Sequence, residues 1–166
     1  RFIHKTVGIH LRKIMNGKEI LDSMIDKRLK KGRIQSFFLN GELVDRINVS
    51  YLEFDNWISV VSTDEITTIR NSGKSIEEIK TFKNEDAEFS YPTELTEILF
   101  PEFEKYIGKK LVEWKELVWK KDNDLSFGIN LYFENNLNLI IHNETIADDK
   151  NEYIFENKLP KDLVEK

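Results

Sequence analysis

Short polar turns divide this chain into apolar segments of strand length, and no other feature of the sequence limits the fold as strongly. Asn40-Gly41, Asp55-Asn56 and Glu134-Asn135-Asn136 each separate two segments in which apolar and polar residues partly alternate. Asn and Gly tolerate the positive φ of tight hairpin turns, and alternation is typical of strands with one buried face. The pattern predicts antiparallel hairpins over residues 34–61 and 111–141.

A helical pattern precedes the first group of strands. Asn16 and Glu19 have the spacing of a capping pair, in which each side chain bonds the backbone amide of the other residue. Apolar residues then recur at helical spacing, and four cations crowd the segment before Gly32, where a helix dipole favours positive charge. We therefore expect a helix over residues 16–31.

Residues 93–107 carry a second helical pattern before the second group of strands. Pro101 must interrupt this helix because proline cannot donate to the carbonyl one turn earlier, and Gly108 ends it. Between the two groups, Ser75-Ile76-Glu77-Glu78 has the form of a capping box and predicts a short helix through Phe82.

The order helix, strand, turn, strand, turn, strand thus occurs twice, in residues 16–70 and 93–149. At a constant offset of 79 residues, Phe54 matches Phe133 and Asn56 matches Asn135. Chance likeness between alternating strands is the alternative to a duplication. The fold prediction is a single α+β domain over residues 1–166, with two α-β-β-β repeats forming a mainly antiparallel sheet and helices packed on one face.

Composition excludes several classes of protein. The 166 residues include no Cys, which excludes disulfide frameworks, thiolate metal sites and cysteine nucleophiles. The longest apolar runs, such as Leu137–Ile141, have only a few residues, and no charged segment followed by an apolar one opens the chain. A cytoplasmic protein that does not cross a membrane is therefore expected.

Charge is distributed unevenly along the chain. Residues 1–83 hold 15 Lys+Arg and 11 Asp+Glu, a balance of +4, whereas residues 84–166 hold 10 and 19, a balance of −9. An acidic half suits a basic protein partner and repels a phosphate backbone. A protein partner is therefore expected and nucleic acid is not, although a chance clustering of solvent-facing charges explains the asymmetry equally well.

Motifs for catalysis and metal binding are incomplete. His142-Asn143-Glu144 lacks the cysteine ligands of a zinc deaminase, and no nucleophile motif is present. Glu113-Trp114-Lys115 has the Glu-x-Lys form of metal-dependent nucleases, but an acidic residue on a preceding strand is missing. We expect no catalytic residues, no metal and no cofactor, with a metal-dependent nuclease as the third hypothesis.

Two tryptophans lie beside predicted turns. Trp57 follows Asp55-Asn56, and Trp119 precedes a polar turn that opens with Lys120 and Lys121. The core is the more common place for an aromatic side chain in a strand, but a tryptophan near a turn also suits an interface anchor.

Two segments, GINLYFENNLNLIIHNE (residues 128–144) and GKKLVEWKELVW (residues 108–119), lie in a small, acidic chain rich in Lys, Asn and Ile. In these features the chain resembles bacterial immunity proteins of polymorphic toxin systems, mainly over residues 108–149 and less closely over residues 32–65. The resemblance implies a cytoplasmic inhibitor that covers the active site of a toxin through a charged surface. It assigns no functional residue.

The sequence therefore predicts a non-enzymatic binding protein whose acidic half steers association with a basic toxin domain. A homodimeric structural or regulatory domain, which would expose an apolar edge rather than a charged face, is the alternative. The predicted contacts with the partner are Glu134, Glu144, Asp148, Asp149 and Glu152, with Trp57 and Trp119 as anchors.

Overall fold

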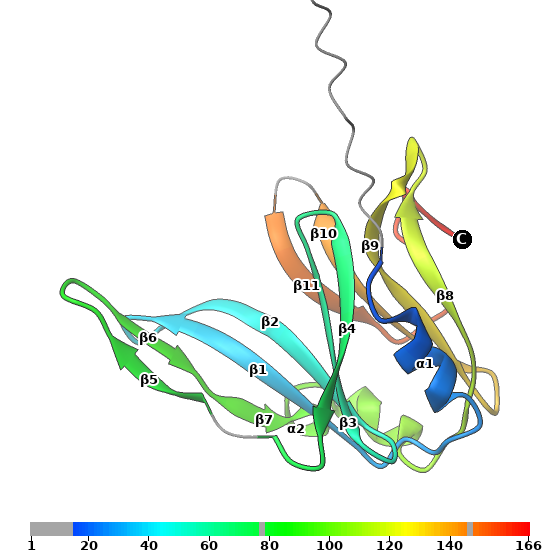
Figure 1. Cartoon of the computed structure of the whole chain (residues 1–166), viewed down its shortest axis with the longest axis horizontal. Helices are drawn as coiled ribbons and strands as arrows, with labels where there is room; N and C mark the ends of the chain where they lie inside the picture. The colour runs from blue at the N-terminus through cyan, green and yellow to red at the C-terminus, as the bar shows by residue number, and fades with distance from the viewer. Residues whose placement is uncertain (1–14, 77–78, 146–147) are drawn as a thin grey trace, which may run out of the picture.

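The computed structural model of the chain describes residues 15–76, 79–145 and 148–166, and only the backbone of residues 79–80, 144–145 and 148–149. These residues form two antiparallel sheets, of seven and five strands. One end of the larger sheet lies against the smaller sheet, and its other end projects away from the body of the molecule (Figure 1).

The larger sheet has the strand order β4-β3-β2-β1-β6-β5, and β7 also pairs with β1. Its strands are β1 (Lys31–Leu39), β2 (Glu42–Glu53), β3 (Trp57–Thr63), β4 (Ile66–Gly73), β5 (Ile79–Lys83), β6 (Glu88–Tyr91) and β7 (Thr93–Leu95). The smaller sheet has the order β11-β10-β9-β8-β12. Its strands are β8 (Leu111–Trp119), β9 (Asp122–Phe133), β10 (Leu137–Thr145), β11 (Asp148–Ile154) and β12 (Leu163–Glu165). The helical segments are α1 (Lys18–Met24), α2 (Thr96–Leu99) and the 3-10 helix η1 (Pro101–Tyr106).

The predicted antiparallel architecture is confirmed, but a single sheet is wrong. Strands β1–β4 belong to one sheet and β8–β11 to the other, so the two predicted groups of strands do not pair with each other edge to edge. Instead, the two sheets pack face to face, and each sheet buries one of its faces against the other sheet. The duplication and the packing of the helices on one face stay predictions.

The predicted turns are confirmed. Asn40 and Gly41 connect β1 to β2 with φ angles of 51° and 81°, and Asn135 and Asn136 connect β9 to β10 with φ angles of 66° and 58°. Two successive positive φ angles match the right-handed twist of the strands that the turn joins, which is why Asn-Gly and Asn-Asn stand here.

The first predicted helix is correct only in its first half. Gly17, with a φ of 86°, is the N-cap of α1, and no side chain of the described residues caps the helix, so the predicted capping pair does not form. The helix ends at Met24 because Ile25 is extended and Asp26 adopts a φ of 68°.

Long-range backbone hydrogen bonds hold the chain extended after α1. The Leu29 amide donates to the Lys109 carbonyl over 2.9 Å, and the Leu111 amide donates to the Lys27 carbonyl over 2.9 Å. Leu29 is fully buried. The cations that resembled a helix C-terminus therefore lie in the segment between α1 and the start of β1, which is not helical.

The second helical passage is wrong over Thr93–Leu95, which form β7 and pair with β1, but the remainder is divided as expected. Pro101 separates α2 from η1 and stands at the start of the latter, and Gly108 follows with a φ of 85°. The helix predicted to run to Phe82 is wrong over Ile79–Lys83, which form β5 and pair with β6.

The main hydrophobic core fills the space between the two sheets. Leu52 and Ile58 of the larger sheet, Leu131 and Leu139 of the smaller sheet, and the η1 residue Phe103 are all fully buried within it. A second, smaller cluster lies on the other face of the smaller sheet; its buried members are Leu117, Phe127, Ile140 and Leu163.

Polar groups also join the two sheets at Ser62 of β3. The Ser62 amide donates to Asn151 Oδ1 over 3.0 Å, and Asn143 Nδ2 donates to the Ser62 carbonyl over 2.9 Å. Asn143 and Asn151 stand opposite each other on β10 and β11. This buried clamp fixes the orientation of one sheet relative to the other.

Candidate interaction surface

The projecting end of the larger sheet has no buried side chain among its described residues. It consists of residues 37–44, at the hairpin of β1 and β2, and residues 79–91, which include β5 and β6; we refer to these two segments as the arm. Figure 1 shows the arm as one layer of strands extending from the body. None of its described side chains belongs to either core cluster.

One face of the arm carries a row of aromatic side chains. Phe37 of β1 stacks on Phe89 and Tyr91 of β6, with ring centroids 6.0 and 5.1 Å apart, and Tyr91 also contacts the Phe82 ring of β5 at 6.5 Å. Phe82, which pairs with Phe89 across the two strands, is 55% exposed. We refer to these four residues as the aromatic face.

The opposite face of the arm is apolar as well but carries fewer aromatic rings. Phe38 pairs with Leu43 on β2 and with Ser90 on β6, so these three side chains point away from the aromatic face. Leu43 is 52% exposed, nearly as much as Phe82. The two residues thus offer similar apolar side chains on opposite faces of the same layer.

Hydrogen bonds join the two hairpin turns at the end of the arm. Asn40 Oδ1 accepts from the Glu88 amide, and the Asn40 amide donates to the Glu88 carbonyl, each over 2.9 Å. In the second turn, the Asn84 and Ala87 backbones bond each other over 2.7 and 3.3 Å. The strands of the arm are therefore held together at their far end.

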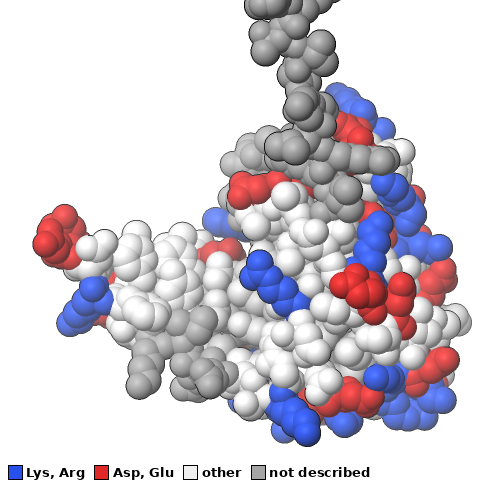
Figure 2. Space-filling model, in the orientation of Figure 1, with Lys and Arg blue, Asp and Glu red and all other residues white. Residues whose placement is uncertain are grey.

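Acidic residues gather at this far end. Figure 2 shows a mostly uncharged arm surface with charged side chains at its tip. Lys83 lies 3.7 Å from Glu88 and offsets part of the negative charge. The acidic tip consists of Glu42, Glu85, Asp86 and Glu88.

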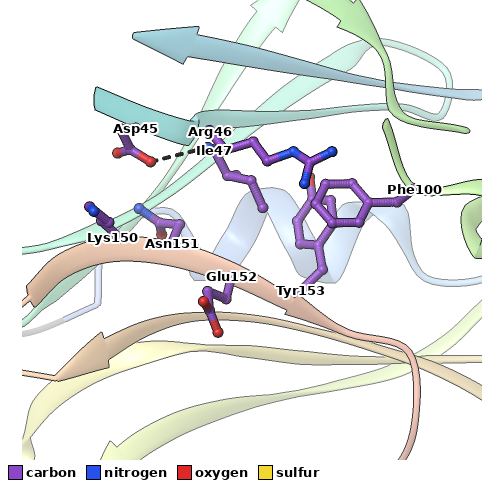
Figure 3. Close-up of a pocket in the computed structure, with 8 residues that line it drawn as sticks. All are labelled: Asp45, Arg46, Ile47, Phe100, Lys150, Asn151, Glu152 and Tyr153. Atoms are coloured by element: carbon purple, nitrogen blue, oxygen red, sulfur yellow. Dashed lines mark hydrogen bonds between the residues drawn. The ribbon is translucent and has the colours of Figure 1, made fainter. Parts of the chain in front are cut away.

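A cleft of about 280 Å³ opens at the base of the arm, between β2 and the edge strand β11. Figure 3 shows the Arg46 guanidinium over the Phe100 ring, at 4.8 Å from its centroid, with Tyr153 beside it. Arg46 also donates to the Leu99 carbonyl over 3.3 Å. Burial raises the pKa of the Tyr153 phenol above its usual value. The volume of the cleft lies just below the range of about 300–1,000 Å³ that is usual for small-molecule pockets.

The predicted contact Glu134 is engaged within the molecule. Its Oε1 accepts from Arg28 Nη1 over 3.0 Å and from the Lys110 amide over 3.2 Å. These bonds hold the pKa of Glu134 below its usual value, the Lys110 amide having the larger effect. Its position indicates a structural role, which ties the extended segment after α1 to the smaller sheet.

The other predicted acidic contacts lie on β10 and β11. Glu152 is exposed on β11, at the edge of the cleft, opposite His142 of β10. The side chains of Glu144, Asp148 and Asp149 lie outside the described part of the chain.

The two predicted tryptophan anchors differ in burial. Trp57 begins β3 and is only 6% exposed, so its ring cannot anchor a partner without a rearrangement. Trp119 is half-buried beside the second core cluster, and Lys121 Nζ lies 5.6 Å from the centroid of its ring.

The Glu-x-Lys pair on β8 forms an internal ion pair. Lys115 Nζ lies 2.9 Å from Glu113 Oε1, and this hydrogen bond raises the pKa of Lys115. Nearby, the Tyr132 hydroxyl donates to Glu165 of β12. In the part of the chain that the structure describes, no three His, Asp or Glu side chains form a group that could hold a metal.

The sequence pattern did not predict the arm as a projecting element. Phe37 and Leu39, and Phe89 and Tyr91, show the two-residue spacing of a strand with one apolar face. The acidic run of residues 84–88 resembles an ordinary loop, however, and only its position between two such segments signals a hairpin.

Comparison of the chain with protein-family models, with curated proteins and with solved structures finds no match. Among the described residues, no helix is long and apolar enough to cross a membrane.

Proposed function

We propose that the chain is a non-enzymatic protein-binding module, and that it acts as a cytoplasmic immunity protein that neutralises a cognate toxin by covering its active site. The observation that carries this proposal is the arm, a single layer of strands whose apolar side chains belong to neither core cluster. The arm is its primary contact element.

Physical chemistry favours a binding role for such a layer. A sheet normally buries at least one face, because apolar surface in water costs about 25 cal/mol per Å². Leu43, Val44 and Phe82 of the arm are all more than 40% exposed. Both faces of the layer thus leave apolar side chains in contact with water, and exposed apolar surface is a mark of protein interfaces.

The inhibitor role is supported by the resemblance and by charge. An acidic tip at the end of a projecting element is suited to enter a basic cleft, such as one that binds a phosphate backbone, and to occupy it in place of the substrate. The same acidic charge makes nucleic acid an unsuitable partner for this chain.

Self-association is the second candidate. The apolar character of the arm favours it, since a homodimeric domain is expected to expose an apolar surface rather than a charged one. Such a dimer would bury the arms of two copies against each other.

We also propose that the two halves descend from one α-β-β-β unit. The orders β4-β3-β2-β1 and β11-β10-β9-β8 correspond, and Phe54 and Phe133, which match in sequence, are both buried in the main core. Strands β5–β7 then have no counterpart in the second half within the described residues. They belong to the arm and its root, as expected for an addition that serves binding.

Affinity capture combined with light scattering tests the proposal. At about 50 mM salt, the purified chain is expected to retain one stoichiometric protein from a lysate of its own organism. At about 500 mM salt, it is expected to release this protein, because the salt screens the charges. Co-expression with this chain is then expected to relieve the toxicity of the captured protein. A chain that retains nothing and elutes with twice its own mass contradicts the inhibitor role and supports the homodimer.

A further inference from the structure

We infer that the arm docks into a basic cleft of a partner protein through its aromatic face, with Phe82 as the anchor and the acidic tip leading. This inference rests on the proposed binding function and assigns the surface, the orientation and the chemistry of the partner. The arm has two exposed faces, and the inference selects the aromatic face over the opposite face, which carries Leu43.

The geometry of the aromatic face points to it as the contact. Its rings form a continuous row from β1 to the outermost strand β5, and the last ring, Phe82, is the most exposed. An aromatic side chain offers a large apolar area with few rotatable bonds, which is why such residues dominate the binding energy of interfaces. The opposite face pairs Phe38 with Leu43 and the polar Ser90.

The charge at the tip identifies the partner as basic. Glu42, Glu85 and Asp86 are exposed, and Lys83 is paired with Glu88. Four carboxylates against one ammonium leave the leading end of the arm negative. A partner that receives this end must supply cations, because like charges brought together oppose binding.

A second copy of the chain fits this surface poorly. Strand β5 carries Lys80 and Lys83 and no acidic residue. Two copies paired along β5 would bring lysines of both copies into one short ladder, and lysines on an edge strand are a common means of preventing such pairing.

The arm is also organised before it binds. The bonds between Asn40 and Glu88 close its far end, and the stacked rings fix Phe37, Phe89 and Tyr91 against one another. A rigid element loses little conformational entropy on docking. The tip is therefore expected to set the association rate and Phe82 the dissociation rate.

Photo-cross-linking tests the choice of face. The probe is p-benzoylphenylalanine, placed at Phe82 in one variant and at Leu43 in the other, in cells of the source organism. Both sites are more than half exposed, and circular dichroism checks that both variants fold. Phe82 is expected to yield an adduct with a basic protein, at least about tenfold more than Leu43. Equal yields from both faces, an adduct with a second copy of the chain, or no adduct overturns the inference.

Binding kinetics with the cross-linked protein, once purified, test the division of roles. Phe82→Ala is expected to raise the dissociation rate about tenfold or more, and Leu43→Ala to change it less than about twofold. Glu85→Lys with Asp86→Lys is expected to lower the association rate about tenfold at low salt and little at high salt. Neither position has a positive φ, so the turn tolerates both changes. If the wild-type chain captures a partner but these variants bind it normally, the inference fails while the binding function stands; if the wild-type chain captures none, the function itself fails.

Discussion

At the scale of single residues, Glu134 shows how a side chain predicted to bind a partner serves the fold. The Lys110 amide and the Arg28 guanidinium hold its pKa below its usual value. The Glu134 carboxylate is therefore protonated less readily in the folded chain than in the unfolded chain. The resulting stability is fully present above the unfolded pKa of about 4.3 and is lost as pH falls through the folded pKa.

Replacing this carboxylate is expected to make the free energy of unfolding depend less on pH in the acidic range. We expect Glu134→Gln to be less stable than the wild type at pH 7, and the difference to shrink as pH falls from about 5 to about 3. Urea unfolding at a series of pH values measures it. The control is Glu156→Gln, which changes an exposed acidic residue just after β11 of the smaller sheet. A difference between Glu134→Gln and wild type that stays constant over this pH range contradicts the assignment.

At the scale of elements, the end of the arm depends on Asn40. Its positive φ forms the turn, and its Oδ1 accepts the Glu88 amide over 2.9 Å. Asn40→Ala removes this acceptor and disfavours the turn, at a cost of about 1–2 kcal/mol. Because the arm lies outside both cores, we expect local opening rather than global unfolding.

Amide hydrogen exchange detects this opening. Protection of the Glu88 amide is expected to fall about tenfold in Asn40→Ala, while amides of β9 in the core keep their protection. Asn71→Ala is the matched control, because Asn71 Oδ1 also accepts a backbone amide, that of Gly73, but does so at the end of β4. Unchanged protection of Glu88, or an equal loss in the Asn71→Ala control, shows that Asn40 does not close the arm.

Local patterns predicted most elements and failed where distant segments decide the backbone. The turns at Asn40 and Asn135 and the break at Pro101 were correct, because each depends on the conformational limits of one or two residues. The first helix stops at Met24 because residues 108–111 bond to residues 26–29, and β5 is a strand because β6 pairs with it. Periodicity within a segment contains no information on such partners.

At the scale of the whole molecule, the two sheets are held by packing and by the clamp at Ser62. The number of sheets could not be predicted, since it depends on which strands pair edge to edge and which stack. The candidate site was missed for the same reason. The sequence shows the aromatic residues of the arm, but not that the arm projects beyond the core that would have buried them.

The clamp gives the last prediction. Asn151→Ala removes the acceptor of the Ser62 amide and leaves a buried donor unsatisfied, at a cost of about 1–3 kcal/mol. Asn143→Ala removes the donor to the Ser62 carbonyl at a similar cost. Both side chains hold the same residue, so we expect the double variant to lose less stability than the sum of the single losses.

Urea unfolding of the two single variants and the double variant measures this coupling. Asn123→Ala, at an exposed position near the start of β9 in the same sheet, is the control and should stay within about 0.5 kcal/mol of the wild type. Additive losses at Asn143 and Asn151 would show that the two amides act separately and that the clamp is not a unit. A coupled loss would show that the two amides act as one unit. Asn151 also lines the cleft at the base of the arm, together with residues of β2, so the clamp would then fix that base to the smaller sheet as a rigid support for docking.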